Sequence, residues 1–269
     1  MKVLRNIGGL KKAINNIPDL GFIPTMGGLH NGHISLIKES KKKCKKTIVS
    51  IYVNPKQFDN KKDFYLYPRT FKKDFILLKK LKIDFLFIPK TKEIYKTKFK
   101  KIKLANKYKC LCAKFRNGHF EGVLNIMERF IKLINPKYIF MGEKDYQQLF
   151  LIEKILNKNK NINIIKCKTV RNKDFLALSS RNNLLTKKEL VKAAFIARNL
   201  YKFKNQILKK NDISKIILNK KKDLINRFNI KIEYLEAKNL SDLMTYKKNK
   251  KFKIFIAYYI RQIRLIDNF

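Results

Sequence analysis

The sequence predicts an α/β protein in which a parallel sheet is followed by a smaller α+β domain. Over the first 170 residues, short apolar segments bounded by turn residues alternate with longer stretches of helical periodicity, which is the pattern of βαβ units. After Val170 the order changes to two helical stretches followed by two extended ones. We therefore expect a sheet domain over residues 1–172 and a second domain over residues 173–269.

The strands of the first domain are predicted where apolar runs meet turn residues. The run that ends at Thr25 leads into Gly27 and Gly28, and the run that begins at Ile83 is stopped by Pro89. Five parallel strands are expected on this basis, at Leu20–Thr25, Thr47–Val53, Ile83–Ile88, Tyr138–Met141 and Ile162–Val170.

Helices are predicted where apolar residues recur at helical spacing, as Phe71, Phe75 and Leu78 do. In the first domain they cover about Asn31–Lys43, Thr70–Leu81, Phe120–Ile134 and Lys144–Leu156. The second domain is expected to contain helices at Lys187–Lys209 and Ile213–Phe228, then extended segments at Ile230–Ala237 and Phe252–Tyr259. Residues 56–70 are predicted to be a polar connection, and residues 90–117 a small extension or flap.

The chain of 269 residues has a net charge of +44, which would attract nucleic acid, acidic lipid and small anions alike. Its lysines are spread over almost every predicted surface and accompany other residues with A/T-rich codons, so we attribute the charge to coding bias rather than to a nucleic-acid partner. Four scattered cysteines indicate neither a zinc site nor a disulfide framework, and no apolar run reaches the ~18 residues of a membrane span. We expect a cytoplasmic protein with no membrane partner.

The stretch from Gly21 to Ile37 predicts a strand, a glycine turn and a helix. Gly27 and Gly28 allow the chain to turn sharply and to approach a phosphate closely. His30 and His33 project from one side of the first helical turn, where the free N–H groups of the helix face the same ligand. Two imidazoles there can stabilise charge on a phosphoanhydride that breaks. The alternative is a simple βα turn in which the histidines only pack or cap.

Polar residues also follow the other predicted strands, and ligands of open parallel sheets gather at these carboxyl ends. Asn54 and Gln57 follow the second strand. After the fourth strand, Lys144 can neutralise a phosphate and Asp145 can accept hydrogen bonds from ribose, with Gln148 one helical turn beyond Lys144. An ordinary charged first turn of a helix is the alternative for this segment.

Two further clusters have both a functional and a structural interpretation. Ser179, Ser180 and Arg181 can clamp a phosphate, although such a tripeptide also begins helices and turns. Arg116 and His119 could hold an anion, but capping of the helix at Phe120 is the preferred interpretation.

Five motifs in order resemble the pantoate–β-alanine ligase family, also called the pantothenate synthetase family. They are PTMGGLHNGH (24–33), VNPKQFDNKKDFYLYPRT (53–70), GHFEGV (118–123), GEKDYQQL (142–149) and ALSSRN (177–182), with a looser match at RLIDN (264–268). The resemblance implies a Rossmann-like nucleotidyltransferase domain with a C-terminal lid. It also implies ATP-dependent condensation of (R)-pantoate with β-alanine through a pantoyl-adenylate, with AMP and diphosphate as products, Mg²⁺ as cofactor, and a homodimer.

Site residues follow from the resemblance, position by position. The catalytic histidine that it implies is His33, and His30, Lys144 and Arg181 are added because they would offset the repulsion between the pantoate carboxylate and ATP. Those implied to bind ATP are Met26, Gly27, Gly28, Leu29, His30, Asn31, Gly32, His33, Gly142, Glu143, Lys144, Asp145, Val170, Leu178, Ser179, Ser180 and Arg181. Pantoate and β-alanine are assigned to Gln57, Gln148 and Asn54, whereas the ligands of magnesium are not identified.

Several positions depart from the family pattern. Phe175 stands where the family has glycine, Leu178 where it has methionine, and Lys168 where it commonly has proline. Asp74 is left alone in a stretch that is otherwise acidic in the family, which puts a magnesium role for this region in doubt. Arg261–Gln262 replaces a usual Gly-Thr and puts the C-terminal turn in doubt.

Two rival functions remain at this point. The first is another enzyme with an H-x-G-H motif, either a nucleotidyltransferase that acts on a different acid or an aminoacyl-tRNA synthetase relative, although the latter needs an anticodon-binding region for which there is little room. The second is a nucleic-acid-binding protein without catalytic activity, whose affinity would fall steeply with salt.

Overall fold

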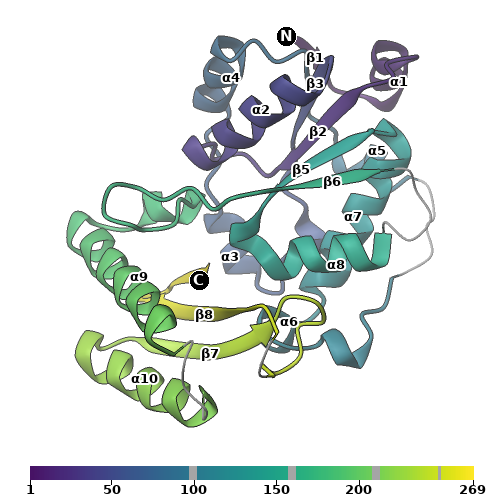
Figure 1. The fold of residues 1–269 in the computed structure, drawn as a ribbon. Coiled ribbons are helices and arrows are strands. Elements are labelled where there is room, and N and C mark those ends of the chain that lie inside the picture. The colour runs from purple at the N-terminus through teal and green to yellow at the C-terminus, as the bar shows by residue number, and fades with distance from the viewer. Residues whose placement is uncertain (97–101, 157–161, 208–212, 248–249) are drawn as a thin grey trace. The chain divides into compact units, whose positions relative to one another are not determined.

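The computed structural model describes residues 1–96, 102–156, 162–207, 213–247 and 250–269 (Figure 1). The chain forms two compact units. The first comprises Met1–Leu104, Asn117–Glu143 and Gln148–Lys168, and the second comprises Ala105–Arg116, Lys144–Gln147 and Thr169–Phe269. The second unit therefore includes two short segments from earlier in the chain, and the division at residue 172 stays a prediction.

The first unit contains a six-stranded sheet in which every pairing is parallel. In sheet order β1-β4-β3-β2-β5-β6, the strands are Lys2–Leu4, Phe85–Phe87, Lys46–Ile51, Leu20–Thr25, Tyr138–Gly142 and Asn163–Cys167. The five predicted strands are all present, and the short strand β1 was not predicted. Because the order reverses between β2 and β5, the carboxyl ends of these two strands mark the position where such sheets bind ligands.

Helices of the first unit are mostly those that periodicity predicts. Predicted helices appear as α2 (Asn31–Lys43), α4 (Phe71–Lys80), α7 (His119–Ile134) and α8 (Tyr146–Leu156), the last preceded by the 3₁₀ turn η3 (Glu143–Asp145). Three short helices were not predicted, namely α1 (Ile7–Ile14), α3 (Lys61–Leu66) and α5 (Thr91–Ile94). Helix α3 lies in the predicted polar connection and α5 in the predicted flap, of which residues 97–101 lie outside the described residues.

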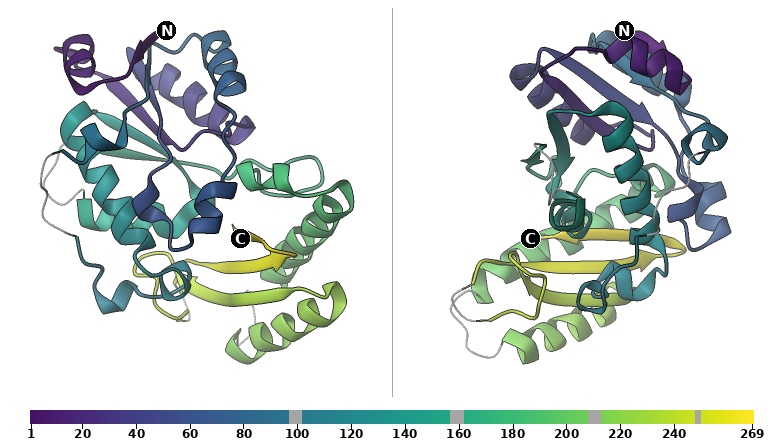
Figure 2. Two further views of the ribbon diagram at one scale, coloured as in Figure 1. Left: turned by 180° about the vertical axis from the view of Figure 1, so that it is seen from behind. Right: turned by 90° about the vertical axis from the view of Figure 1, so that its right-hand side faces the viewer.

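Helices lie on both faces of the parallel sheet (Figure 2), which is what a sheet with apolar strands requires. On one face, Ile37 of α2 and Leu78 of α4 share a buried cluster with Ile23 of β2. On the other face, the ring of Phe130 on α7 packs edge-on against Phe22, with 5.7 Å between centroids. Phe22 and Ile23 are adjacent in β2, so their opposite directions follow from the two-residue period of a strand.

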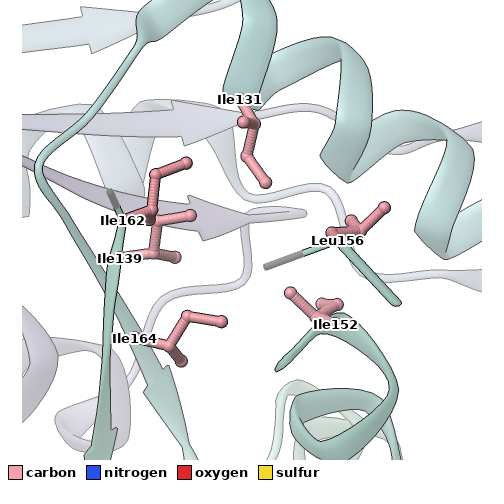
Figure 3. Close-up of a pocket in the computed structure, with 6 residues that line it drawn as sticks. All are labelled: Ile131, Ile139, Ile152, Leu156, Ile162 and Ile164. Carbon is pink, nitrogen blue, oxygen red and sulfur yellow. The ribbon is translucent and has the colours of Figure 1, made fainter. Parts of the chain in front are cut away.

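An aliphatic pocket lies between α7, α8, β5 and β6 (Figure 3). Its lining consists of Ile131, Ile139, Ile152, Leu156, Ile162 and Ile164. Because none of these side chains is polar, the pocket belongs to the core rather than to a site for a charged substrate.

The second unit contains an antiparallel sheet in the order β7 (Lys231–Asn239), β8 (Phe252–Ile260) and β9 (Ile263–Asn268). Helices α9 (Lys187–Ile207) and α10 (Ile213–Phe228) share its buried core. The predicted α/β class with a smaller α+β part is thus confirmed, while residues 208–209 of the first predicted helix lie outside the described residues. In the part of the chain that the structure describes, no helix combines the length and apolar character needed to cross a bilayer.

Strand β9 was not predicted, because its polar sequence does not alternate cleanly with apolar residues. The turn before β9, where Arg261–Gln262 replaces the usual Gly-Thr, is a two-residue hairpin turn that pairs Ile260 with Ile263. Arg261 adopts a φ of 51° in this turn, and its guanidinium contacts the carboxylate of Glu189. The substitution of the usual Gly-Thr is therefore accommodated by a left-handed arginine with an ion pair.

The packing of β2 against the end of α2 can be tested at Gly21. A Cβ added to Gly21 would lie 2.3 Å from Ser40 Oγ and 2.8 Å from Cys44 Sγ. Because both neighbours belong to a packed interior, Gly21→Ala should lower the free energy of unfolding by about 1–3 kcal/mol. Gly8→Ala is the control, since its added Cβ would meet only Asn6 Oδ1 at 3.7 Å. Equal denaturant midpoints for both variants would contradict this packing.

Candidate active site

A glycine turn follows β2 at the sheet position that favours ligands. Gly27 and Gly28 adopt φ angles of 82° and 63°, in the left-handed region that suits glycine. The hydroxyl of Thr25 donates to Ser50 O at 2.7 Å and accepts from the backbone N–H of Gly27 at 3.2 Å. The turn is thereby tied to the neighbouring strand β3.

The same turn is fixed from α4 by Asp74, which is only 2% exposed. One carboxylate oxygen accepts from the N–H of Gly28 and the other from the N–H of Leu29, each at 2.9 Å. The hydroxyl of Thr70 donates to the carboxylate as well, at 3.2 Å. Because three donors already occupy this buried carboxylate, Asp74 organises the turn and does not fit a role as a magnesium ligand. Sequence reasoning considered Asp74 only for magnesium and missed this role.

His30 and His33 lie side by side at the first turn of α2, with ring centroids 4.2 Å apart. Nδ1 of His30 accepts from the N–H of Gly32 at 3.1 Å, and Nδ1 of His33 accepts from the N–H of His30 at 3.3 Å. A neutral imidazole whose Nδ1 accepts carries its proton on Nε2, so these contacts assign both Nε2 atoms as donors. The histidines therefore cap the helix, as one of the two alternatives expects, and their role toward a phosphate stays a prediction.

Asn54 is the N-cap of the 3₁₀ turn η1 (Pro55–Gln57) that follows β3, and Gln57 is the last residue of this turn. The amide Nδ2 of Asn54 donates to Gln57 Oε1 at 3.3 Å and to Gly122 O at 3.2 Å. Nε2 of Gln57 lies 2.8 Å from Met26 Sδ. The structure thus brings Asn54 and Gln57 to the glycine turn, as predicted for residues at neighbouring strand ends.

Helix α7 supports η1 through an unusually close approach. A Cβ added to Gly122 would lie 2.2 Å from Lys56 O and 2.8 Å from Gln57 Cα, so only glycine fits. Nδ1 of His119 lies 2.7 Å from the carbonyl oxygen of Gln57. Helix α7 begins at His119 with Gly118 as its N-cap, so this segment caps the helix as expected through Gly118, while His119 contacts η1. Within residues Gly118–Gly122, His119 and Gly122 hold η1 against α7.

A second layer of side chains sets the orientation of Asn54. The Tyr95 hydroxyl donates to Asn54 Oδ1 at 2.9 Å, and the Arg129 guanidinium lies 4.6 Å from the centroid of the Tyr95 ring. Burial raises the pKa of Tyr95 to about 12, so its hydroxyl remains a donor at neutral pH. With Oδ1 occupied, the amide nitrogen of Asn54 faces Gln57. Sequence analysis gave no signal for Tyr95 or Arg129.

The remaining predicted residues of the first unit are placed by β5, α2 and α8. Asn31 and Gly32 form the first turn of α2. Gly142 ends β5 and Glu143 begins η3. Gln148 is half-buried on α8.

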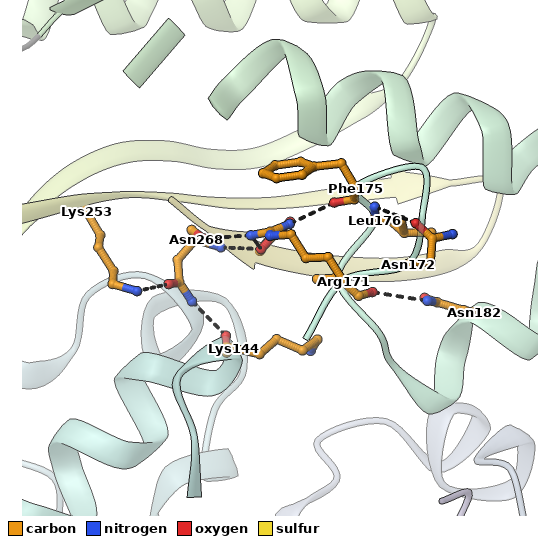
Figure 4. A network of polar contacts seen from close by, with 10 residues as sticks. Lys144, Arg171, Asn172, Phe175, Leu176, Asn182, Lys253 and Asn268 are labelled. Carbon is orange, nitrogen blue, oxygen red and sulfur yellow. Dashed lines mark hydrogen bonds and ion pairs between the residues drawn. The ribbon is translucent and has the colours of Figure 1, made fainter. Parts of the chain in front are cut away.

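The second unit contains the other predicted ATP residues. Val170 O accepts from the N–H of Leu178 at 3.0 Å, which closes the loop between them. Ser179 is the N-cap of the 3₁₀ turn η4 (Ser180–Leu184), and its Oγ accepts from the N–H of Arg181 at 3.3 Å. Lys144 Nζ pairs with Asp145 Oδ1 at 3.3 Å. Lys144 and the loop that leads to Arg181 belong to one polar network (Figure 4).

Phe175, at the position of the family glycine, adopts the backbone conformation that a glycine would supply. Its φ is 74°, which costs about 1–2 kcal/mol for a residue with a side chain. The Arg171 guanidinium lies 4.6 Å from its ring centroid, and the Tyr201 ring lies 4.7 Å away. These contacts offset the unfavourable backbone angle.

Removal of the Asp74 carboxylate should release the glycine turn. In Asp74→Ala the buried N–H groups of Gly28 and Leu29 lose their acceptors, which should cost about 2–5 kcal/mol of folding free energy. The exposed Lys73, its neighbour on α4, provides the control variant Lys73→Ala. Urea denaturation measures both changes. A loss below 1 kcal/mol in Asp74→Ala would show that the turn does not depend on this carboxylate.

Comparison with known families and curated proteins shows a consistent match. The family model described as pantoate–β-alanine ligase matches residues 2–269. The pantothenate synthetase of Flavobacterium psychrophilum is 39% identical over 268 residues, covering 96% of this chain and 94% of the relative. That of Buchnera aphidicola subsp. Acyrthosiphon pisum is 43% identical over 285 residues, covering 100% of this chain and 95% of the relative.

Solved structures agree with the sequence comparison. The crystal structure of pantothenate synthetase from Thermus thermophilus superimposes with a TM-score of 0.91 at 28% identity, covering 100% of this chain and 99% of that chain. The pantoate–β-alanine ligase of Francisella tularensis, complexed with β-γ ATP and β-alanine, gives a TM-score of 0.82 at 36% identity, with 100% and 97% covered. Both similarities extend over the two units.

Proposed function

This chain belongs to the pantoate–β-alanine ligase family, and on that premise we propose that it condenses pantoate with β-alanine at the expense of ATP, through a pantoyl-adenylate. The products are pantothenate, AMP and diphosphate. The assignment as a ligase of pantothenate biosynthesis rests on the family, whereas the intermediate and the roles of individual residues are our proposal.

The observation that supports ATP binding most directly is the histidine pair on the glycine turn. The left-handed glycine turn and the N-terminus of α2 together favour an anion, and the Nε2 donors of both imidazoles are proposed to reach its oxygens. The Francisella tularensis enzyme was solved with β-γ ATP and β-alanine, which supports the same ligands here. Met26, Leu29, Asn31, Gly142 and Glu143 complete the part of this proposed site in the first unit.

Pantoate is proposed to bind beside this turn, at Asn54, Gln57 and Gln148. Pantoate is a hydroxy acid, and neutral amides can bond both its hydroxyls and its carboxylate without adding charge. The amide of Gln57 is fixed from three sides, by Asn54, by Met26 and by α7 behind its backbone. Such support holds a substrate in one orientation, which is where much of the rate enhancement of a two-substrate reaction originates.

In the first step, a carboxylate oxygen of pantoate attacks the α-phosphorus of ATP and diphosphate leaves. The attacking group and the phosphate are both negative, so their approach needs compensation. We assign this compensation to the Nε2 donors of His30 and His33 and to the cationic groups of Lys144 and Arg181. These contacts strengthen as charge builds on the phosphate, which lowers the barrier of the step.

In the second step, the neutral amine of β-alanine attacks the acyl carbon of the adenylate and AMP leaves with the bridging oxygen. The amine loses a proton to solvent as the amide forms. Because the activated acid is already an acyl phosphate ester, this route needs no nucleophilic side chain from the protein.

Magnesium is proposed only as the counter-ion of the substrate phosphates. Asp74 is occupied by backbone donors, and within the described ranges no three His, Cys, Asp or Glu side chains are grouped so that they could hold a metal ion. Mg²⁺ commonly binds through nucleotide phosphates and retains several waters. A cytoplasmic location, expected from the cysteine pattern, and a homodimer, implied by the family resemblance, are likewise part of the proposal.

A substrate-dependence assay tests the function. Purified protein with ATP and magnesium should release diphosphate only when pantoate is added, and AMP turnover should require β-alanine as well. Diphosphate exchange that depends on an amino acid instead would identify the aminoacyl-tRNA synthetase alternative. Salt-sensitive nucleic-acid binding without any diphosphate release would favour the non-catalytic alternative.

His33 supplies the sharpest mutational test of the first step. His33→Ala removes the Nε2 donor and should lower pantoate-dependent diphosphate release by about 10²-fold or more. His33→Gln restores an N–H near the Nε2 position and should recover part of that loss. Rapid-quench measurement of the first turnover reports the step directly. A wild-type rate in His33→Ala would remove this residue from the mechanism.

A further inference from the structure

The polar residues at the end of β9 contact both ATP-binding segments of the second unit (Figure 4). Asn268, which is 3% exposed, donates through Nδ2 to the carbonyl oxygen of Lys144 at 2.8 Å. Its Oδ1 accepts from Lys253 Nζ, also at 2.8 Å. The amide side chain therefore uses its donor for Lys144 and its acceptor for Lys253, whereas a carboxylate in its place would offer acceptors alone.

The neighbouring carboxylate binds the other segment. Arg171 donates to Asp267 through both of its terminal nitrogens, at 2.7 and 2.9 Å, and to Asn268 O at 3.2 Å. The same guanidinium donates to Phe175 O at 3.1 Å and lies 4.8 Å from the ring centroid of Phe269. A planar arginine with two bonds to one carboxylate fixes orientation as well as distance.

Arg171 begins the loop that carries the serine motif. Asn172 Oδ1 accepts from the N–H of Leu176 at 2.9 Å, and Asn182 Nδ2 donates to Ala177 O at 3.1 Å. Hydrogen bonds within the loop thus close both sides of its turn. Arg171 connects the loop to β9 through its bonds to Asp267. Any displacement of Asp267 would be transmitted to the whole loop.

We propose that Asp267 and Asn268 are positioning residues for adenylation, which fix the backbone of Lys144 and the loop before Arg181 on one strand. The inference rests on the proposed function. Lys144 and Arg181 have long side chains, and a phosphate contact made by either depends on where its backbone is fixed. Neither Asp267 nor Asn268 needs to touch a substrate for this role. The motif RLIDN is thereby linked to the site rather than only to the small sheet.

Asn268→Asp separates the two bonds of this side chain. The new carboxylate keeps its acceptor for Lys253 but presents an acceptor, in place of a donor, to the carbonyl of Lys144. We expect kcat for pantoate-dependent diphosphate release to fall about tenfold, with a KM for ATP that changes less, because a contact realised in the transition state is weakened. Amide hydrogen exchange over residues 144–147 should become about tenfold faster.

Asn239→Asp is the matched control on β7 of the same sheet. Asn239 is also fully buried, and its Nδ2 donates to the backbone carbonyl of Thr245 at 3.2 Å. The control should lose stability while kcat and exchange over residues 144–147 stay at wild-type values. A similar loss of kcat in both variants would reduce Asn268 to a structural residue and overturn the proposal, as would wild-type kcat and exchange in Asn268→Asp.

Failure of the proposed function would give a different result. In that case the wild-type protein would release no diphosphate with pantoate. Unchanged exchange over residues 144–147 in Asn268→Asp would still overturn the positioning of Lys144, whereas faster exchange would support that part of the inference independently of activity.

Discussion

A buried carboxylate that satisfies two backbone N–H groups is the constraint on which the site depends. Asp74 accepts from Gly28 and Leu29, and the hydroxyl of Thr25 accepts from Gly27, the other glycine of the left-handed turn. The position of this turn also determines where α2 begins, so that the helix starts at Asn31 with His30 as its N-cap. A buried carboxylate without these donors would be costly, so helix, turn and carboxylate stabilise one another. The positions of the His30 and His33 imidazoles follow from this arrangement.

The same logic applies to the amides proposed to bind pantoate. Gln57 occupies a 3₁₀ turn that would be strained or displaced if α7 had any side chain at Gly122. Tyr95 bonds the adjacent Asn54, and Arg129 packs on the ring of Tyr95. Neither residue lies in one of the sequence motifs, so motif reasoning could not find them. Specificity for a hydroxylated carboxylate would then arise from rigid amides that bond its hydroxyls.

Most helices and strands could be predicted from the sequence, whereas the side-chain contacts that fix the site could not. Long apolar runs and helical periodicity identified β2 to β6, α2, α4 and α7, because burial on two faces leaves a strong pattern. The elements β1, α1 and α3 bury at most one side chain each, which is too few to show such a pattern. The histidine turn was found because histidines are rare and glycines punctuate the chain. Asp74 could not be assigned, since its partners are 45 and 46 residues away and are backbone atoms. The contact of His119 was missed for the same reason, because its partner is the backbone carbonyl of Gln57.

The central claim is that pantoate is activated as an adenylate at the histidine turn. Its most direct test follows oxygen atoms from the acid to the nucleotide. With pantoate labelled by ¹⁸O in its carboxylate, and with ATP and β-alanine present, mass spectrometry of the products should show one labelled oxygen in AMP and none in diphosphate. Unlabelled AMP, or ADP together with labelled inorganic phosphate, would contradict the adenylate and with it the proposed role of the site.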